Sequence, residues 1–88
     1  MKFILDCSKM VSMSEIHEQL KNTLPLPGYY GKNLDALWDI LSELSEPMEI
    51  ILENFSDTPE KTKTYVNSLV KVLDHVAKKR DNFKFTIS

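Results

Sequence analysis

Three short apolar runs, each separated from the next by segments with helical patterns, limit most strongly how this chain can fold. The runs cover residues 2–7, 48–52 and 83–87, and each has the length of one strand. Because the intervening segments are long enough for helical crossovers, the strands are expected to pair in parallel. The pattern predicts an α/β fold: a small three-stranded parallel sheet packed by three to four helices, in the order β-α-α-β-α-α-β. One domain is expected over residues 1–88.

Capping residues and prolines mark the expected helices. Ser12 begins a capping-box pattern at the start of a first helix, which ends before Pro25. Asn33 is placed to cap a second helix, expected to run to about Leu44. The segment over residues 56–79 is helical as well, and its pattern fits either one helix or two.

Two further features bear on burial and location. Ile50, Ile51 and Leu52 form an uninterrupted apolar run, which is typical of a sheet covered on both faces. Cys7 is the only cysteine and is interpreted as a small core residue rather than a reactive thiol. A single cysteine provides no internal disulfide, so a reducing cytoplasm is the expected location. No apolar run reaches the length that spans a membrane.

Charge is segregated along the chain although the net charge is only −2. The stretch over residues 33–60 contains eight acidic residues and no Lys or Arg, whereas the rest of the chain has eleven basic and five acidic residues. A concentrated negative charge attracts a basic partner and speeds its association. The acidic residues of the stretch are Asp35, Asp39, Glu43, Glu46, Glu49, Glu53, Asp57 and Glu60.

The segment over residues 29–39, Tyr-Tyr-Gly-Lys-Asn-Leu-Asp-Ala-Leu-Trp-Asp, is the strongest functional signal. Asp35 lies in the first turn of the expected helix, and Asp39 follows one turn later on the same face. A partner that supplies Arg or Lys would form charge-assisted hydrogen bonds with both carboxylates. Tyr29 and Trp38 add rigid aromatic area of the kind enriched at binding hot spots. The segment therefore predicts a surface that binds a cationic protein.

A metal-dependent enzyme is the alternative from a different class. Asp35, Asp39 and Glu43 could together hold Mg²⁺. However, no residue follows at a spacing that would complete the coordination sphere, and the chain has neither a phosphate-binding glycine loop nor a nucleophile motif. The sequence therefore favours a binding protein without catalysis, metal or cofactor.

The histidines and the basic cluster are interpreted as structural. His17 lies near the apolar stripe of the first helix and is expected to be packed, whereas His75 falls on the polar side of the last helix. Lys78, Lys79 and Arg80 form a short run at a helix C-terminus, where cations are favoured, and are interpreted as a solvated cap. Direct binding to nucleic acid or to a membrane is not expected.

Leu26-Pro27 followed by residues 29–39 closely resembles the signature of the barstar family of intracellular ribonuclease inhibitors, and the similarity extends over the whole chain. The resemblance implies a monomer that needs no cofactor and protects its producer by blocking a small basic ribonuclease of the barnase type. A barstar-fold interaction module with another toxin or a regulatory protein as its partner is the runner-up.

The resemblance also implies residue roles. Asp39 would occupy the pocket meant for an RNA phosphate, Asp35 would bind beside it, and Tyr29 would pack over the catalytic histidine of the ribonuclease. Asn33, Leu34 and Trp38 would complete the central contact. The flanking contacts differ from the family pattern, and this suggests a different cognate enzyme. The residues that stand at these flanking positions are Glu43, Leu44, His75 and Lys79.

Overall fold

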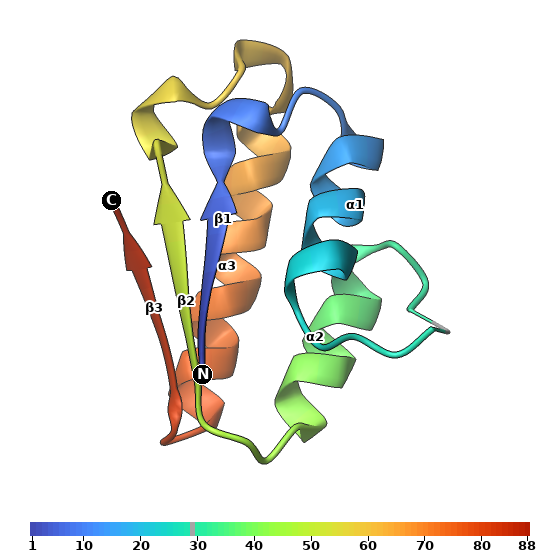
Figure 1. Ribbon diagram of the computed structural model, residues 1–88, viewed down its shortest axis with the longest axis vertical. Coiled ribbons are helices and arrows are strands. Elements are labelled where there is room, and N and C mark those ends of the chain that lie inside the picture. The colour runs from blue at the N-terminus through green and yellow to red at the C-terminus, as the bar shows by residue number, and fades with distance from the viewer. Residues whose placement is uncertain (29) are drawn as a thin grey trace.

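Three parallel strands form one sheet in the computed structural model, which describes residues 1–28 and 30–88 (Figure 1). The strands are β1 (Lys2–Asp6), β2 (Met48–Glu53) and β3 (Phe83–Ile87). They lie in the order β1-β2-β3, and both pairings are parallel. The predicted fold class is therefore confirmed.

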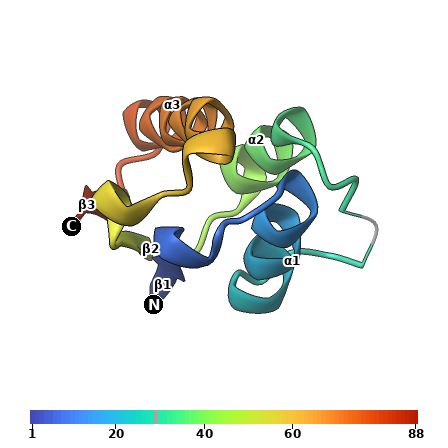
Figure 2. The same ribbon diagram turned by 90° about the horizontal axis from the view of Figure 1, so that it is seen from above.

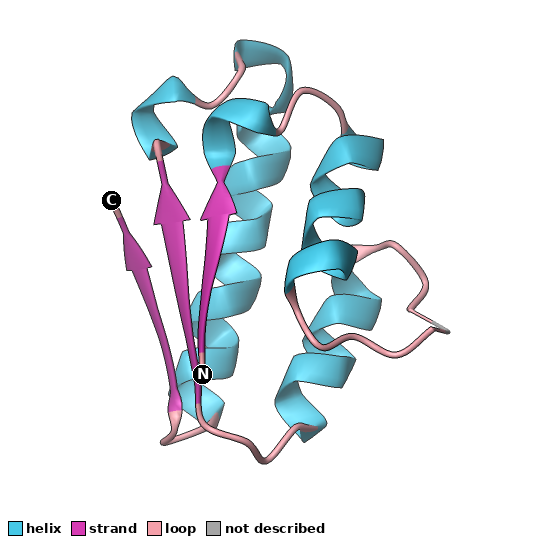
Figure 3. Ribbon diagram, in the orientation of Figure 1, coloured by secondary structure: helices cyan, strands magenta, loops and turns pink. Residues whose placement is uncertain are grey.

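Three α-helices accompany the sheet in the described part of the chain (Figure 3). They are α1 (Met13–Thr23), α2 (Leu34–Glu43) and α3 (Lys63–Lys79), and the short 3-10 segments are η1 (Cys7–Lys9), η2 (Phe55–Asp57) and η3 (Glu60–Thr62). The segment over residues 56–79, for which one or two helices were predicted, thus consists of 3-10 turns followed by one long helix. Pro59 contributes to this division because it lacks the N–H that a continuous helix would need.

The α-helices all lie on one face of the sheet (Figure 2). Leu5, Ile50 and Leu52 point toward the helices and are completely buried. The prediction of a sheet covered on both faces was wrong, because none of the described α-helices lies over the second face. Ile51 belongs to that face, since side chains alternate along a strand. Ile4, its neighbour in the register, is 48% exposed on the same open face.

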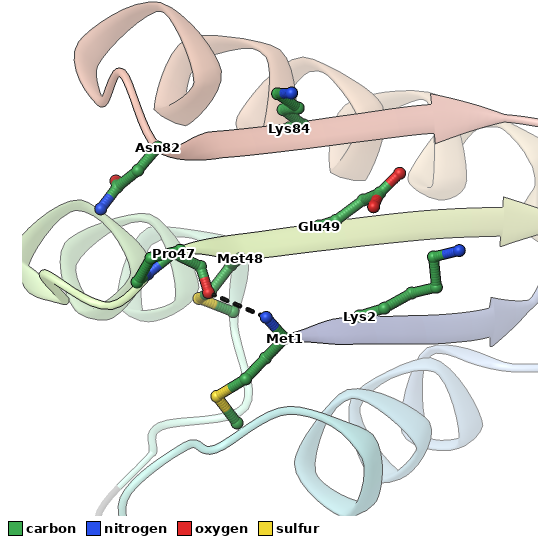
Figure 4. Close-up of a pocket in the computed structure, with 7 residues that line it drawn as sticks. All are labelled: Met1, Lys2, Pro47, Met48, Glu49, Asn82 and Lys84. Atoms are coloured by element: carbon green, nitrogen blue, oxygen red, sulfur yellow. Dashed lines mark hydrogen bonds between the residues drawn. The ribbon is translucent and has the colours of Figure 1, made fainter.

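The open face carries part of the acidic stretch. Glu49 lies between Lys2 and Lys84 in the register, so the signs of the charges alternate across the three strands (Figure 4). These residues line a shallow hollow of about 410 Å³ where the strands begin. Glu53 lies further along β2. The acidic stretch is therefore divided in space between this face, α2 and the 3-10 turns, and it does not form one surface.

Cys7 is buried as the sequence predicted, whereas Arg80 is buried although the sequence predicted a solvated residue. Cys7 is completely buried, and burial raises the pKa of its thiol, so it is the core residue that was predicted.

Arg80, predicted to be part of a solvated cap, is only 8% exposed. Its guanidinium donates hydrogen bonds to the backbone carbonyls of Leu41 (2.9 Å) and Glu46. These carbonyls lie at the end of α2 and just beyond it, where helices leave acceptors unpaired, so Arg80 satisfies them.

Candidate functional site

The start of α2 is fixed by a cap. Asn33 Oδ1 accepts a hydrogen bond from the backbone N–H of Ala36 (2.8 Å), and its side-chain amide donates to the carbonyl of Gly31 (3.3 Å). Lys32, just before the cap, has a left-handed backbone with φ of 53°, a conformation that non-glycine residues adopt at some cost. Together these features set where the helix begins and put Asp35 in its first turn, where the helix dipole favours a carboxylate.

Three carboxylates, which we call the acidic row, follow one another at four-residue intervals along α2. They belong to Asp35, Asp39 and Glu43, and all three residues are exposed. Within the described part of the chain, none of them forms an ion pair with a Lys, an Arg or a His. Like charges one turn apart repel one another. The acidic row is therefore a surface that a cationic partner would stabilise.

Trp38 lies between the acidic row and α3. It is half-buried, and Lys79 Nζ lies 4.8 Å from the centroid of its ring, within range of a cation–π interaction. His75 is exposed one turn before Lys79 on α3. The surface is thus acidic along α2, with the cation of Lys79 beside it on the neighbouring edge of α3.

Among the other residues predicted to contact the partner, Leu34 and Asn33 are each partly engaged within the protein itself. Leu34 is half-buried and packs against the core at the start of α2, so only part of its side chain is accessible. Tyr29 lies outside the described residues. Asn33 is exposed, but its side chain is engaged in the cap. The structure therefore brings Asp35, Asp39 and Glu43 onto one helix face, with Trp38 and the α3 edge beside them.

A buried network that the sequence did not reveal anchors the segment before α2. His17 is 3% exposed. Its Nδ1 lies 2.6 Å from the hydroxyl of Tyr30, and its Nε2 lies 2.6 Å from the hydroxyl of Tyr65. Because a neutral imidazole has one donor and one acceptor, His17 donates to one hydroxyl and accepts from the other. The packed position predicted for His17 is confirmed, and the network ties the loop before α2 to α1 and α3.

The protonation states in this network follow from burial. Burial, and secondarily the neighbouring Tyr65, raises the pKa of Tyr30 to about 12. Burial is also the larger cause, and Lys32 the smaller, of a lowered pKa for His17. Both groups are therefore neutral at pH 7, which is the state in which the two hydrogen bonds to the imidazole form.

Stability is expected to decrease in mild acid because of His17. Its pKa in the folded protein lies below the ordinary value of 6.5, so as the pH falls the unfolded chain binds the proton first. The contribution of neutral His17 is fully present above a pH of about 6.5 and is lost as the pH falls below it toward the lowered pKa. Urea unfolding across this range should show a smaller pH dependence for His17→Asn than for the wild type, and equal slopes would contradict the assignment.

A groove beside the acidic row was also not expected from the sequence. Its volume is about 390 Å³, and we call it the proline groove. One wall is the loop after α1, and the other is the last turn of α2. The lining residues are Pro25, Leu26, Pro27, Ile40, Glu43 and Leu44. Sequence patterns do not reveal such a feature because it depends on how a loop packs against a helix 13 or more residues away in the chain.

The described residues contain neither a cluster of metal ligands nor a helix that could span a membrane. Within residues 1–28 and 30–88, no three His, Cys, Asp or Glu side chains gather closely enough to hold a metal ion. The carboxylates of the acidic row extend along the helix instead of converging on one point. None of the helices in the described segments has the length and apolar character needed to cross a bilayer.

The fold and this surface define a small parallel α/β domain that presents an acidic helix face to solvent, and comparison with known proteins places it. The sequence model of the family described as barstar (barnase inhibitor) matches residues 1–88. The Bacillus subtilis (strain 168) protein named "Putative ribonuclease inhibitor YrdF" is 33% identical, and the match covers 98% of this chain and 97% of that protein. The chain belongs to the barstar family.

Proposed function

We propose that this protein is a stoichiometric inhibitor of a small basic ribonuclease of the barnase type. The observation that carries the proposal is the acidic row, exposed and without ion pairs in the described structure, on α2 of a barstar-family domain. The name of the Bacillus subtilis relative, a ribonuclease inhibitor, supports the same activity. The protein acts by occlusion and performs no catalysis of its own.

In this proposal the carboxylates mimic RNA phosphates. The active site of a ribonuclease is lined by cations that hold a phosphate, and a carboxylate held on a rigid helix can take the place of that phosphate. Asp39 enters the pocket, and Asp35 binds beside it, close to the cap. Trp38 supplies rigid aromatic area at the centre of the contact. Tyr29, Asn33 and Leu34 complete the proposed central contact, and Glu43 and His75 are the proposed flanking contacts.

The direct test is RNA cleavage by a panel of small ribonucleases of the barnase type, with this protein added at increasing molar ratio. Activity should fall linearly and reach zero near one inhibitor per enzyme for the cognate class. No inhibition across the panel would contradict the proposal and direct the search to a non-ribonuclease partner. The linear form requires an enzyme concentration well above the dissociation constant, so the titration is repeated at a higher enzyme concentration if the curve is rounded.

Salt is expected to act mainly on the rate of association. Between about 0.01 M and about 0.15 M salt, the Debye length decreases from about 30 Å to about 8 Å, which shortens the reach of the acidic row. The association rate constant should fall about tenfold over this range while the dissociation rate constant changes little. Stopped-flow mixing with the inhibited ribonuclease measures both, and an association rate that is independent of salt would rule out electrostatic steering.

The proposed role is that of an immunity protein acting in the cytoplasm of the cell that makes the ribonuclease. The buried, unpaired thiol of Cys7 is compatible with a reducing compartment. In such a cell the inhibitor protects RNA until the enzyme is secreted. The protein is proposed to be a monomer before it binds the enzyme.

A further inference from the structure

The proline groove combines apolar walls with a single charge. Ile40 and Leu44 form one wall and are half-buried, so their side chains remain partly accessible from the groove. The opposite wall consists of two prolines with a leucine between them. Glu43 is exposed at the rim and forms no ion pair with any residue that the structure describes.

This combination favours one kind of side chain. A long basic side chain can lay its aliphatic stem on apolar walls and keep its charged end at a rim. The planar guanidinium of arginine also pairs with a carboxylate through two parallel hydrogen bonds. A purely apolar side chain would remove water from Glu43 without replacing the lost hydrogen bonds, which costs free energy. An acidic side chain would be repelled.

The groove is continuous with the acidic row. Glu43 is both the last residue of the row and part of the groove, one helical turn after Asp39. A partner whose cations meet Asp35 and Asp39 would therefore present its neighbouring surface to the groove. Because that partner is basic, the charge of the groove matches the surface that reaches it.

The walls of the groove are already in place without a ligand. Pro25 and Pro27 have restricted backbones, and the carbonyl of Pro27 accepts a hydrogen bond from the backbone N–H of Tyr30 (3.0 Å). Tyr30 is itself held by His17. On the other wall, the N–H of Leu44 donates to the carbonyl of Ile40 (3.1 Å). A site that needs little ordering costs less conformational entropy when it is filled.

We infer that the proline groove is a subsite that receives an arginine side chain of the partner ribonuclease, with the stem on Ile40 and Leu44 and the guanidinium on Glu43. The inference rests on the proposed function for the identity of the partner. The groove would select among ribonucleases, because only an enzyme with an arginine near the rim of its active site could fill the groove while the central contact forms.

The chemistry of the groove is tested without any ribonuclease. Isotope-labelled protein is titrated with N-acetyl-arginine methylamide, and the NMR signals of Ile40 and Leu44 are followed. Shifts that saturate are expected for the wild type and for Glu46→Gln, an exposed carboxylate outside the groove. They should be lost in Glu43→Gln, which removes the same charge without a change of size. Equal shifts in Glu43→Gln, equal shifts with N-acetyl-norleucine methylamide, or no saturable shift would overturn the inference.

The second arm uses a ribonuclease that the wild type inhibits. The dissociation constant should rise about tenfold for Glu43→Gln, the size expected for loss of a charge-assisted hydrogen bond, and should change little for Glu46→Gln. If Glu43→Gln binds as tightly as the wild type while Asp39→Ala does not, the groove is overturned and the proposed function stands. If the wild type inhibits no ribonuclease but binds the arginine probe, the proposed function fails and the preference of the groove for arginine stands.

Discussion

Replacing Asp39 with alanine is expected to weaken binding to the cognate ribonuclease by about a hundredfold or more. Asp39 is the middle carboxylate of the acidic row, and in the proposed complex it is surrounded by cations from which water is excluded. Each hydrogen bond to a charged group contributes about 1.5–3 kcal/mol, and the truncation also leaves the cations of the partner unpaired in a desolvated pocket. Titration of RNA cleavage with wild type and variant measures the ratio of the two inhibition constants.

The same variant should fold at least as well as the wild type, and this separates binding from stability. Asp39 has Asp35 and Glu43 one turn away on either side, so its removal relieves repulsion between like charges. Alanine also has a higher helix propensity than aspartate. Glu49→Ala, on the open face of the sheet, is the matched control and should bind like the wild type. Similar small losses for both variants would exclude a specific role for Asp39.

The features of α2 that the sequence predicted correctly depend on local patterns. Asn33 caps α2 and the carboxylates at four-residue spacing share a helix face, as expected. The same helical period puts the half-buried Trp38 at the edge of the α2 face that carries the buried Leu37 and Leu41. Local spacing is enough to place these side chains, since all of them lie within about three turns of one helix.

Features that join distant segments could not be predicted in this way. His17 contacts Tyr30 and Tyr65, which are 13 and 48 residues away in the chain. The contact between Lys79 and Trp38 joins two helices, and the proline groove joins a loop to a helix. Each of these depends on how the helices pack on the sheet, and the hydrophobic period alone does not determine that packing.

The acidic stretch shows the converse case, in which residues close together in the sequence are separated in the fold. Glu49 and Glu53 belong to β2 and point to the open face of the sheet, whereas Asp35 and Asp39 lie on α2. Strands and helices of an α/β domain carry consecutive parts of the chain to different layers. In the proposed complex, the carboxylates of α2 would make the direct contact, and Glu49 and Glu53 would lie outside it.

The second large effect is expected for Arg80→Ala, which should lower the free energy of unfolding by about 3 kcal/mol. Arg80 is buried, and its guanidinium also donates to the side-chain carbonyl of Asn82 (3.1 Å). Its loss leaves the carbonyls of Leu41 and Glu46 without these partners and opens a cavity between α2 and β2. Urea unfolding at equilibrium measures the change, and Arg80→Lys should recover only part of it because an ammonium cannot reproduce the fork of the guanidinium.

Lys78→Ala is the matched control for Arg80, since it removes a positive charge two residues earlier in the same run. Lys78 is exposed and pairs with Asp74 (3.0 Å) on the surface of α3, an interaction worth no more than about 0.5 kcal/mol. A large loss of stability for Arg80→Ala and a negligible one for Lys78→Ala would show that Arg80 is a buried structural residue, whereas Lys78 is solvated. Because Arg80 holds the end of α2, its loss should also disturb the position of Glu43 more than that of Asp35. The proposed contact of Glu43 with the partner should therefore weaken more than that of Asp35. If both variants have the same urea midpoint of unfolding as the wild type, the hydrogen bonds of Arg80 do not stabilise the fold.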